Sequence, residues 1–236
     1  MGLTIAYILG DGSKHHNLEL RLSLRSVEKH INPTRVIVCG HDPGFLSENV
    51  EYIPNFPAKK EDDAAFGIKE NLLALCSHPS TPDEFLLMND DVFFLQPTKE
   101  FPYYHKGELR DAMERVGSGI FYGHLLATVT VLEKLNLPTK HFDGHWPIVY
   151  DKLKLLNAIN ETNWDVPLGP TIRSLYCNTL GINGEYADDV KANRPVGDWP
   201  AFCLGKSVIS VSDESFDRKC QAYLLSLFPS KSKYER

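Results

Sequence analysis

"EFLLMNDDVFFLQP", residues 84–97, places three polar residues between two apolar runs. The run before Asn89, Asp90 and Asp91 is typical of a buried strand, and residues 92–95 favour renewed extended structure. Carboxylates in such apolar surroundings are costly unless they are paired or bound to a cation. We therefore expect a ligand at the point where this strand ends.

The first hundred residues alternate between strand and helix patterns. These patterns predict strands at 3–10, 35–40, 50–56 and 84–88, and helices at 17–30 and 62–78, the second of which ends before Pro79. Asn17 is a suitable N-cap for the first helix, although the alternating leucines that follow it also suit a strand. The order predicts βαβ units, and hence an α/β fold with a mostly parallel, Rossmann-type sheet flanked by helices.

The second half of the chain is expected to be more helical and richer in loops. Its apolar patterns predict helices at 108–116, 127–135, 150–159, 171–180 and 215–227. No internal repeat or linker interrupts the sequence, so we expect a single domain over residues 1–236.

Composition narrows the class of protein. The net charge of −6 argues against nucleic acid as a general partner. Five scattered cysteines without a CxxC pair are typical of free thiols in an intracellular protein. No run approaches the ~18 apolar residues of a membrane span, and the start of the chain does not resemble a signal peptide. We therefore expect a cytoplasmic protein.

The acidic triplet has two interpretations. Asn and Asp suit tight turns, so a hairpin turn is the simpler one. The apolar flanks favour a ligand site, because two adjacent carboxylates repel unless a divalent cation lies beside them. Oxygen ligands favour Mg²⁺ or Mn²⁺, whose coordination is commonly completed by substrate phosphates. This chemistry suits an enzyme that uses a nucleotide sugar, because the metal neutralises the leaving diphosphate.

Metal coordination by a single strand-end motif is incomplete. Asp91 is the predicted ligand within the triplet, and Asp189 in "EYADDVKA" is the candidate that returns to complete the site.

A short DxD-type acidic motif at a strand end, after an α/β half, resembles the GT-A class of glycosyltransferases. Several blocks, in order, resemble the Stealth family of capsular-polysaccharide sugar phosphotransferases and its shorter bacterial and phage members. These blocks are "YILGDGSKHHNLELRLSLRSVEKH" (7–30), "FLLMNDDVFF" (85–94), "HFDGHWPIVYDKLKLL" (141–156), "TIRSLYCNTLG" (171–181) and "SLFPSKSKYE" (226–235). The "YTWV" element and the regulatory insertions of the larger members are missing, so the short members are the nearest match.

The resemblance implies a GT-A-like fold with a nucleotide-binding half at 1–97 and an acceptor and catalytic half at 98–236. His145 matches the family's active-site histidine, as a general base or as a hydrogen-bond partner of the donor phosphate. Arg173 gains nothing from the dipole at a helix N-terminus, so a diphosphate is one reason for its place and a surface salt bridge is the other. Asp90 completes the predicted catalytic set.

The remaining candidates are donor-binding residues. Asn89 belongs to the triplet, Asp11 follows the first strand, and Lys69 lies on the helix before the acidic strand. Arg21 and Arg25 are one helical turn apart, which suits a shared phosphate contact. A solvated surface or simple loop geometry is the alternative for those outside the triplet.

The expected function is that of a metal-dependent glycosyltransferase in a bacterial or phage-infected cell. The donor is a nucleotide sugar, UDP-sugar favoured, and the acceptor is a hydroxyl of a glycan or of a hydroxymethylated DNA base. A Stealth-type transfer of hexose 1-phosphate is the alternative reaction, and a nucleotide-sugar-binding module is the alternative without catalysis.

Overall fold

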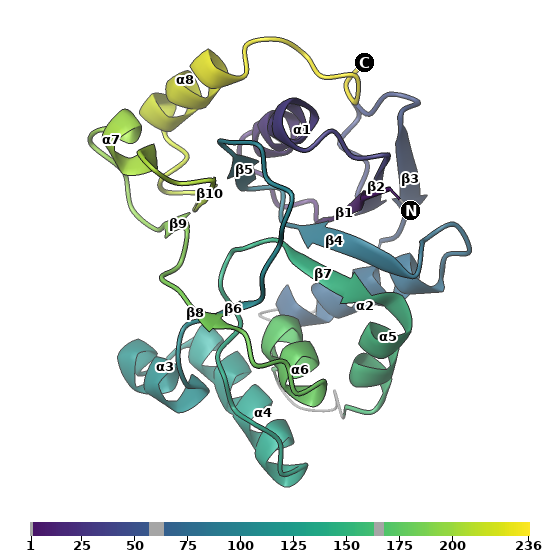
Figure 1. Ribbon diagram of the computed structural model, residues 1–236, viewed down its shortest axis with the longest axis vertical. Helices are drawn as coiled ribbons and strands as arrows, with labels where there is room; N and C mark the ends of the chain where they lie inside the picture. The colour runs from purple at the N-terminus through teal and green to yellow at the C-terminus, as the bar shows by residue number, and fades with distance from the viewer. Residues whose placement is uncertain (1, 57–63, 163–167) are drawn as a thin grey trace.

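The computed structural model describes residues 2–56, 64–162 and 168–236, and its centre is a five-stranded sheet (Figure 1). The strand order is β3-β2-β1-β4-β7. The bounds are Thr4–Leu9 for β1, Arg35–Gly40 for β2, Val50–Pro54 for β3, Glu84–Met88 for β4 and Ile148–Asp151 for β7. Pairings among the first four strands are parallel, and β7 runs antiparallel to β4. The predicted α/β fold with a mostly parallel sheet flanked by helices is confirmed.

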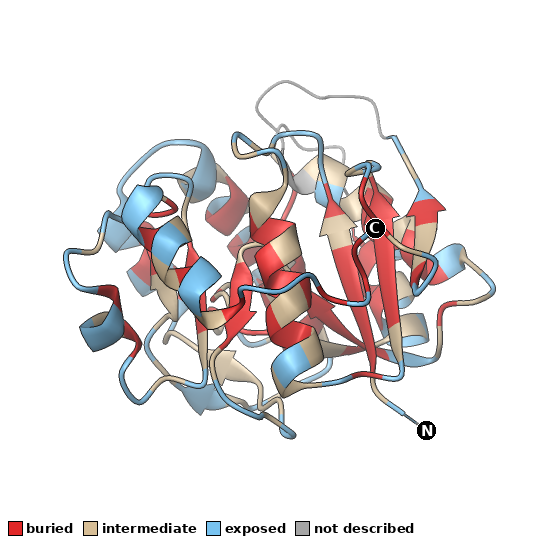
Figure 2. Ribbon diagram, turned by 90° about the horizontal axis from the view of Figure 1, so that it is seen from above, coloured by how far each residue is buried: buried red, intermediate tan, exposed pale blue. Residues whose placement is uncertain are grey.

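The central strands are buried on both faces, which is why they read as continuous apolar runs. Figure 2 shows the buried strands between helices whose outer sides are exposed. Gly40 ends β2 with φ of 124°, and a Cβ there would collide with the carbonyl oxygen of Leu9. Only glycine allows β1 and β2 to end this close together.

Helices cover both faces of the sheet (Figure 1). On one face, α2 (Ala64–Ser77), α5 (Lys152–Asn160) and α6 (Ile172–Thr179) pack over side chains of β1, β2, β4 and β7. On the other face, α1 (Leu18–His30) packs over the same strands through Leu20, Leu24 and Val27.

The leucine alternation in α1 follows from burial on two sides. Leu20 and Leu24 contact the main sheet, whereas Leu22 belongs to a second apolar cluster with Phe93 and Phe216. The predicted cap is wrong, because Asn17 is left-handed (φ 57°) and its side chain makes no capping hydrogen bond. The hydroxyl of Ser13 instead accepts from the backbone N–H groups of His15 and Asn17.

Smaller elements surround this core. A three-stranded sheet, in the order β5-β10-β9, joins Val92–Phe94, Val208–Val211 and Lys191–Ala192, and β6 (Tyr104–His105) pairs with β8 (Glu185–Tyr186). The helices outside the core are α3 (Leu109–Val116), α4 (Ile120–Lys134), α7 (Trp199–Cys203) and α8 (Arg218–Leu227). The chain thus leaves the main sheet immediately after the acidic triplet and enters another one.

Several predicted helix bounds are wrong. Tyr150 lies in strand β7, because it pairs with Phe85 of β4, and α5 begins only at Lys152. Helix α4 begins at Ile120, seven residues before its predicted start at 127, and α8 begins at 218, where Asp217 caps it. The predicted start of the helix at 62 lies outside the described residues.

The two halves of the chain interleave. Strand β7 from the second half pairs with β4 of the first, and one apolar cluster contains residues from both. Over the described ranges, no helix is long and apolar enough to cross a bilayer. The division at residue 97 stays a prediction.

Candidate active site

The candidate site lies at the carboxyl edge of the main sheet, where ligands of open α/β sheets commonly bind. The loop after β1 and the triplet after β4 both start at this edge, because the two strands are parallel neighbours. The antiparallel β7 brings its beginning to the same edge, with Ile148 beside Leu87. Sheet topology therefore places His145, three residues before β7, near Asn89–Asp91.

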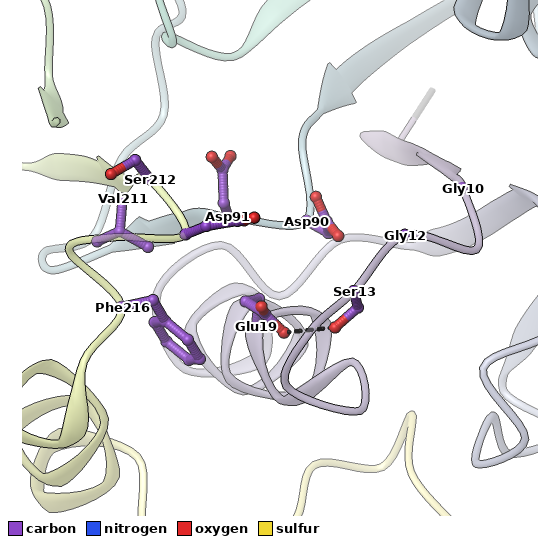
Figure 3. Close-up of a pocket in the computed structure, with 10 residues that line it drawn as sticks. Gly10, Gly12, Ser13, Glu19, Asp90, Asp91, Val211, Ser212 and Phe216 are labelled. Atoms are coloured by element: carbon purple, nitrogen blue, oxygen red, sulfur yellow. Dashed lines mark hydrogen bonds between the residues drawn. The ribbon is translucent and has the colours of Figure 1, made fainter. Parts of the chain in front are cut away.

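Two cavities meet at the triplet. The larger, of about 680 Å³, is lined by Asn89, Asp90, His145, Arg173 and Asp189 among others. The smaller, of about 230 Å³, lies between the glycine loop after β1 and the turn after β10, and its lining includes Asp90 and Asp91. Figure 3 shows this smaller cavity, where Asp90 lies on the side of Gly12. Asp90 therefore faces both spaces.

Asp90 has an unusual acidity for an aspartate. Burial raises its pKa to about 7, and the adjacent charge of Asp91 acts in the same direction. A carboxyl group with this pKa can take up or give a proton near neutral pH, which is what general acid–base catalysis requires.

Asp91 is partly neutralised within the protein. Its Oδ2 accepts from the Lys191 ammonium at 3.1 Å. Its Oδ1 is buried and has no hydrogen-bond partner among the described residues. A buried carboxylate oxygen without a partner is costly, so this atom is suited to a ligand or a cation.

His145 lies between a carboxylate and a cation. Its Nδ1 is 3.1 Å from both carboxylate oxygens of Asp189, and its Nε2 is 3.3 Å from Nζ of Lys191. An ammonium group only donates, so Nε2 accepts and the ring proton lies on Nδ1, facing Asp189. Asp189 also accepts from Lys106 at 2.8 Å. Burial opposes the charge of Asp189, but hydrogen bonds from His145 and Lys106 outweigh it and hold its pKa well below the ordinary value.

Arg173 joins the triplet to the loop before β7. Its guanidinium donates to the backbone carbonyls of Gly144 and Trp146 and, at 2.9 Å, to Oδ1 of Asn89. These bonds fix the distance between the end of β4 and the start of β7. The predicted surface salt bridge is absent from the described contacts of Arg173, and its role in the structure is to position Asn89 and the 144–146 loop.

Asp143 joins the same loop to the start of α6. Its carboxylate accepts from the hydroxyls of Thr171 and Ser174 and from the Ser174 backbone N–H, so it caps α6 from another segment. His141 lies 3.5 Å away. Burial acts to raise the pKa of Asp143, but the hydrogen bonds from these groups outweigh it, and the pKa is lowered.

Four predicted donor-binding residues lie elsewhere. Arg21 and Arg25 both pair with Glu235, at 3.2 and 2.8 Å, and line neither cavity. Lys69 is 2.9 Å from Glu70 and faces the Phe66 ring. Asp11 is exposed between Gly10 and Gly12, which line the smaller cavity, but is not itself part of the lining. The structure therefore gathers the triplet, His145, Arg173 and Asp189, and leaves these four outside.

Lys106 and Lys191 are the site residues that sequence reasoning missed. Both line the larger cavity, and they bind Asp189 and Asp91 respectively. No motif surrounds either lysine. The one available signal was the position of Lys191, two residues after the candidate ligand Asp189.

The residues fit a metal ion only in part. In the described portion of the chain, no group of three or more His, Cys, Asp or Glu side chains is arranged to hold one. His145 and Lys191 lie between Asp91 and Asp189, so the two predicted ligands do not meet. The unpartnered Oδ1 of Asp91, beside Asp90, fits an ion whose other ligands come from a phosphorylated substrate.

Comparison with known proteins assigns the chain to no family. No family model and no curated protein matches the chain. Among solved structures, the galactosyltransferase LgtC in complex with donor and acceptor sugar analogues has a TM-score of 0.49 and 13% identity, covering 98% of this chain and 96% of its own.

Two further structures are more distant. The glycosyltransferase GlyE of Streptococcus pneumoniae TIGR4 has a TM-score of 0.46 and 9% identity, over 98% of this chain and 61% of its own. 4-Diphosphocytidyl-2C-methyl-D-erythritol synthase has a TM-score of 0.37 and 12% identity, over 80% of this chain and 90% of its own. At these TM-scores the likenesses carry no functional argument. The resemblance to the Stealth family stays a prediction.

Proposed function

We propose that the protein is a nucleotide-sugar-dependent transferase. The observation that supports this most strongly is the composition of the larger cavity at the carboxyl edge of the sheet. Three cations, Lys106, Arg173 and Lys191, line it together with Asp90, in a volume of about 680 Å³. Cations suit a diphosphate, and a carboxyl group that titrates near neutrality suits proton transfer from an acceptor hydroxyl.

The proposed reaction is glycosyl transfer. The acceptor oxygen forms a bond to the anomeric carbon, the bond from that carbon to the diphosphate oxygen breaks, and its electron pair leaves with the nucleoside diphosphate. The hydroxyl proton passes to Asp90, whose pKa of about 7 suits it as the base. His145 holds Lys191 through Nε2, so its first role is to position that lysine rather than to take the proton.

The proposed metal lies at the unpartnered Oδ1 of Asp91. When bound there, Mg²⁺ or Mn²⁺ neutralises the charge that develops on the leaving diphosphate. The protein's own part is to hold both carboxylates in place, which Arg173 does through Asn89 and Lys191 does through Asp91.

A sugar hydroxyl is the acceptor that we propose. The net charge of −6 opposes approach to a DNA duplex, which would carry a modified base. UDP-sugars are the first donors to try, and cytoplasmic bacterial or phage glycans are the first acceptors.

A thermal-shift panel of nucleotide sugars, each with Mn²⁺ and with EDTA, tests the donor site. A ligand that binds only the native state raises the melting temperature, so we expect one donor class to stabilise the protein. Incubation of that donor with glycans and with hydroxymethylated DNA then identifies the acceptor. Release of nucleoside diphosphate indicates glycosyl transfer, whereas release of monophosphate indicates transfer of the phosphosugar.

Asp90→Asn tests the proposed base. We expect the rate of product formation to fall by roughly 10²–10⁴-fold, while the thermal shift with the donor persists. Asp111→Asn, at an exposed position on α3, is the control and should match the wild type. If no nucleotide sugar shifts the melting temperature in either buffer, the proposed function is wrong.

A further inference from the structure

Lys191 connects the acidic triplet to the histidine of the site. It lies in β9, which is parallel to β10, and β10 in turn pairs with β5 immediately after the triplet. Its side chain is 17% exposed, and its Nζ lies 3.1 Å from Asp91 and 3.3 Å from His145. Two sheet pairings and two side-chain contacts therefore fix its ammonium group at the junction of the cavities.

The ammonium group retains capacity for a ligand. It carries three N–H donors, and the contacts with Asp91 and His145 use two of them. Lys191 supplies the cation beside Asp91, with its Nζ at 3.1 Å from Oδ2. Because Lys191 lines the larger cavity, its third donor is available to an oxygen of a bound molecule.

The other two cations of the cavity have different partners. Arg173 donates three hydrogen bonds, one to Asn89 and two to backbone carbonyls. Lys106 lies at 2.8 Å from Asp189, whose pKa is strongly lowered because Lys106 and His145 both donate to it. Lys191 also differs from both because it contacts a carboxylate of the triplet, at the strand end where the ligand is expected.

We propose that Lys191 binds the phosphate oxygens of the donor directly, as the cationic phosphate ligand beside Asp91. The assignment rests on the proposed function, because it names the residue that receives the diphosphate of the nucleotide sugar. The ligand chemistry is that of a phosphate or diphosphate dianion. His145 and Asp189 are positioning residues in this scheme, since they hold Lys191 at the wall of the larger cavity.

Titration calorimetry with inorganic pyrophosphate in EDTA tests the contact without assuming a base or a metal. We expect the wild type to bind and Lys191→Met to bind about 10–100-fold more weakly, as expected for loss of a charge-assisted hydrogen bond. Lys191→Arg keeps the charge and should recover part of the affinity. Lys99→Met, at an exposed lysine outside both cavities, should bind like the wild type.

A purely structural role for Lys191 predicts a different pattern. In that case Lys191→Met loses affinity only because Asp91 is left uncompensated, and the double variant Lys191→Met/Asp91→Asn regains wild-type binding. Such recovery overturns the proposal, and so does equal binding by Lys191→Met and wild type. A double variant that stays as weak as Lys191→Met supports it.

The two proposals can fail separately. If wild type does not bind pyrophosphate in EDTA, the direct contact is wrong, while the nucleotide-sugar thermal shift with Mn²⁺ still decides the proposed function. If pyrophosphate binds through Lys191 but no nucleotide sugar stabilises the protein, the anion site stands and the transferase does not.

Discussion

Arg173 shows how one side chain can define a site. Its planar fork reaches three acceptors on two segments, Asn89 after β4 and the 144–146 loop before β7. A lysine carries the same charge but donates from a single point, so it cannot replace this pattern.

Arg173→Lys is therefore expected to damage the site more than its conservative chemistry suggests. Loss of two of the fixed hydrogen bonds should lower the free energy of unfolding by about 1–3 kcal/mol. Displacement of the triplet should lower kcat/KM by about 100-fold. Urea titrations and initial rates measure the two effects. Arg115→Lys, on the exposed side of α3, should change neither; equal effects in both variants would contradict the positioning role.

At the residue scale, sequence reasoning named side chains that the structure gathers at the two cavities, and these belong to recognisable blocks except for Asp189. The triplet, His145, Arg173 and Asp189 all line the two cavities. It missed Lys106 and Lys191 because a lone lysine has no spacing that distinguishes it from a solvated one. It misplaced Arg21 and Arg25 because their partner, Glu235, lies more than two hundred residues away in the chain.

At the scale of elements, α6 depends on a residue outside itself. Thr171 precedes the helix but makes no capping bond to it, and Asp143 provides the acceptor instead. The carboxylate is 11% exposed and accepts from Thr171 and Ser174 as well. The loop that carries His145 is therefore anchored to the start of the helix that carries Arg173.

Asp143→Ala should cost roughly 3–5 kcal/mol of unfolding free energy, because it removes the acceptor of the Thr171 and Ser174 hydroxyls and the carboxylate beside the buried His141. Asp151→Ala removes a partly exposed N-cap of α5 and should cost only about 1 kcal/mol. Urea-denaturation midpoints compare the two. Similar losses in both variants would mean that Asp143 is an ordinary cap.

Leu22→Ala tests the two-sided burial of α1. Leu22 is fully buried in the cluster with Phe93 and Phe216, so its truncation should cost roughly 2–5 kcal/mol. Leu153→Ala, at a leucine that is 63% exposed, should stay within about 0.5 kcal/mol. A small effect at Leu22, measured by the same titration, would place the second cluster outside the cooperative core.

The helices and strands could be predicted from the sequence wherever a single hydrophobic period dominates. The parallel strands are buried on both faces and therefore stand out as apolar runs. Strand β7 was missed because Tyr150 and Asp151 continue directly into a helix, and the pairing with β4 is a tertiary contact that local propensity does not contain. The start of α4 was missed because Gly123 interrupts its first turns.

At the scale of the whole molecule, residues 232–236 return to the first helix. The side chain of Glu235 is fully buried and pairs with Arg21 and Arg25. Tyr234 packs against the main sheet. Burial acts to raise the pKa of Glu235, but bonds from Arg25 and from the Ser232 N–H outweigh it, so the pKa lies below its ordinary value. This contact joins the two ends of the described chain.

The pH dependence of stability follows from that shift. A carboxyl group whose pKa is lower in the folded state stabilises the fold at pH values above its unfolded-state pKa, which is near 4.3. This contribution is lost as the pH falls through the folded-state pKa. Wild type should therefore lose stability below pH ~4.3. Glu235→Gln should be less stable at pH 7, by roughly 3 kcal/mol, and should depend less on pH in the acid range.

Urea midpoints measured from pH 7 down to the acid limit provide the check. Glu114→Gln, at an exposed position on α3, is the control and should follow the wild-type curve. If the curves of Glu235→Gln and wild type stay parallel throughout, Glu235 does not titrate as the ion pair requires.

Asp90 is shared by the two cavities, and this has a consequence for inhibitor chemistry. Fragments that occupy the two spaces end on opposite sides of one carboxylate. A short covalent linker between them would make the second binding event intramolecular, with an effective concentration on the order of millimolar. A compound assembled from two weak fragments can therefore gain affinity without any new contact to the protein.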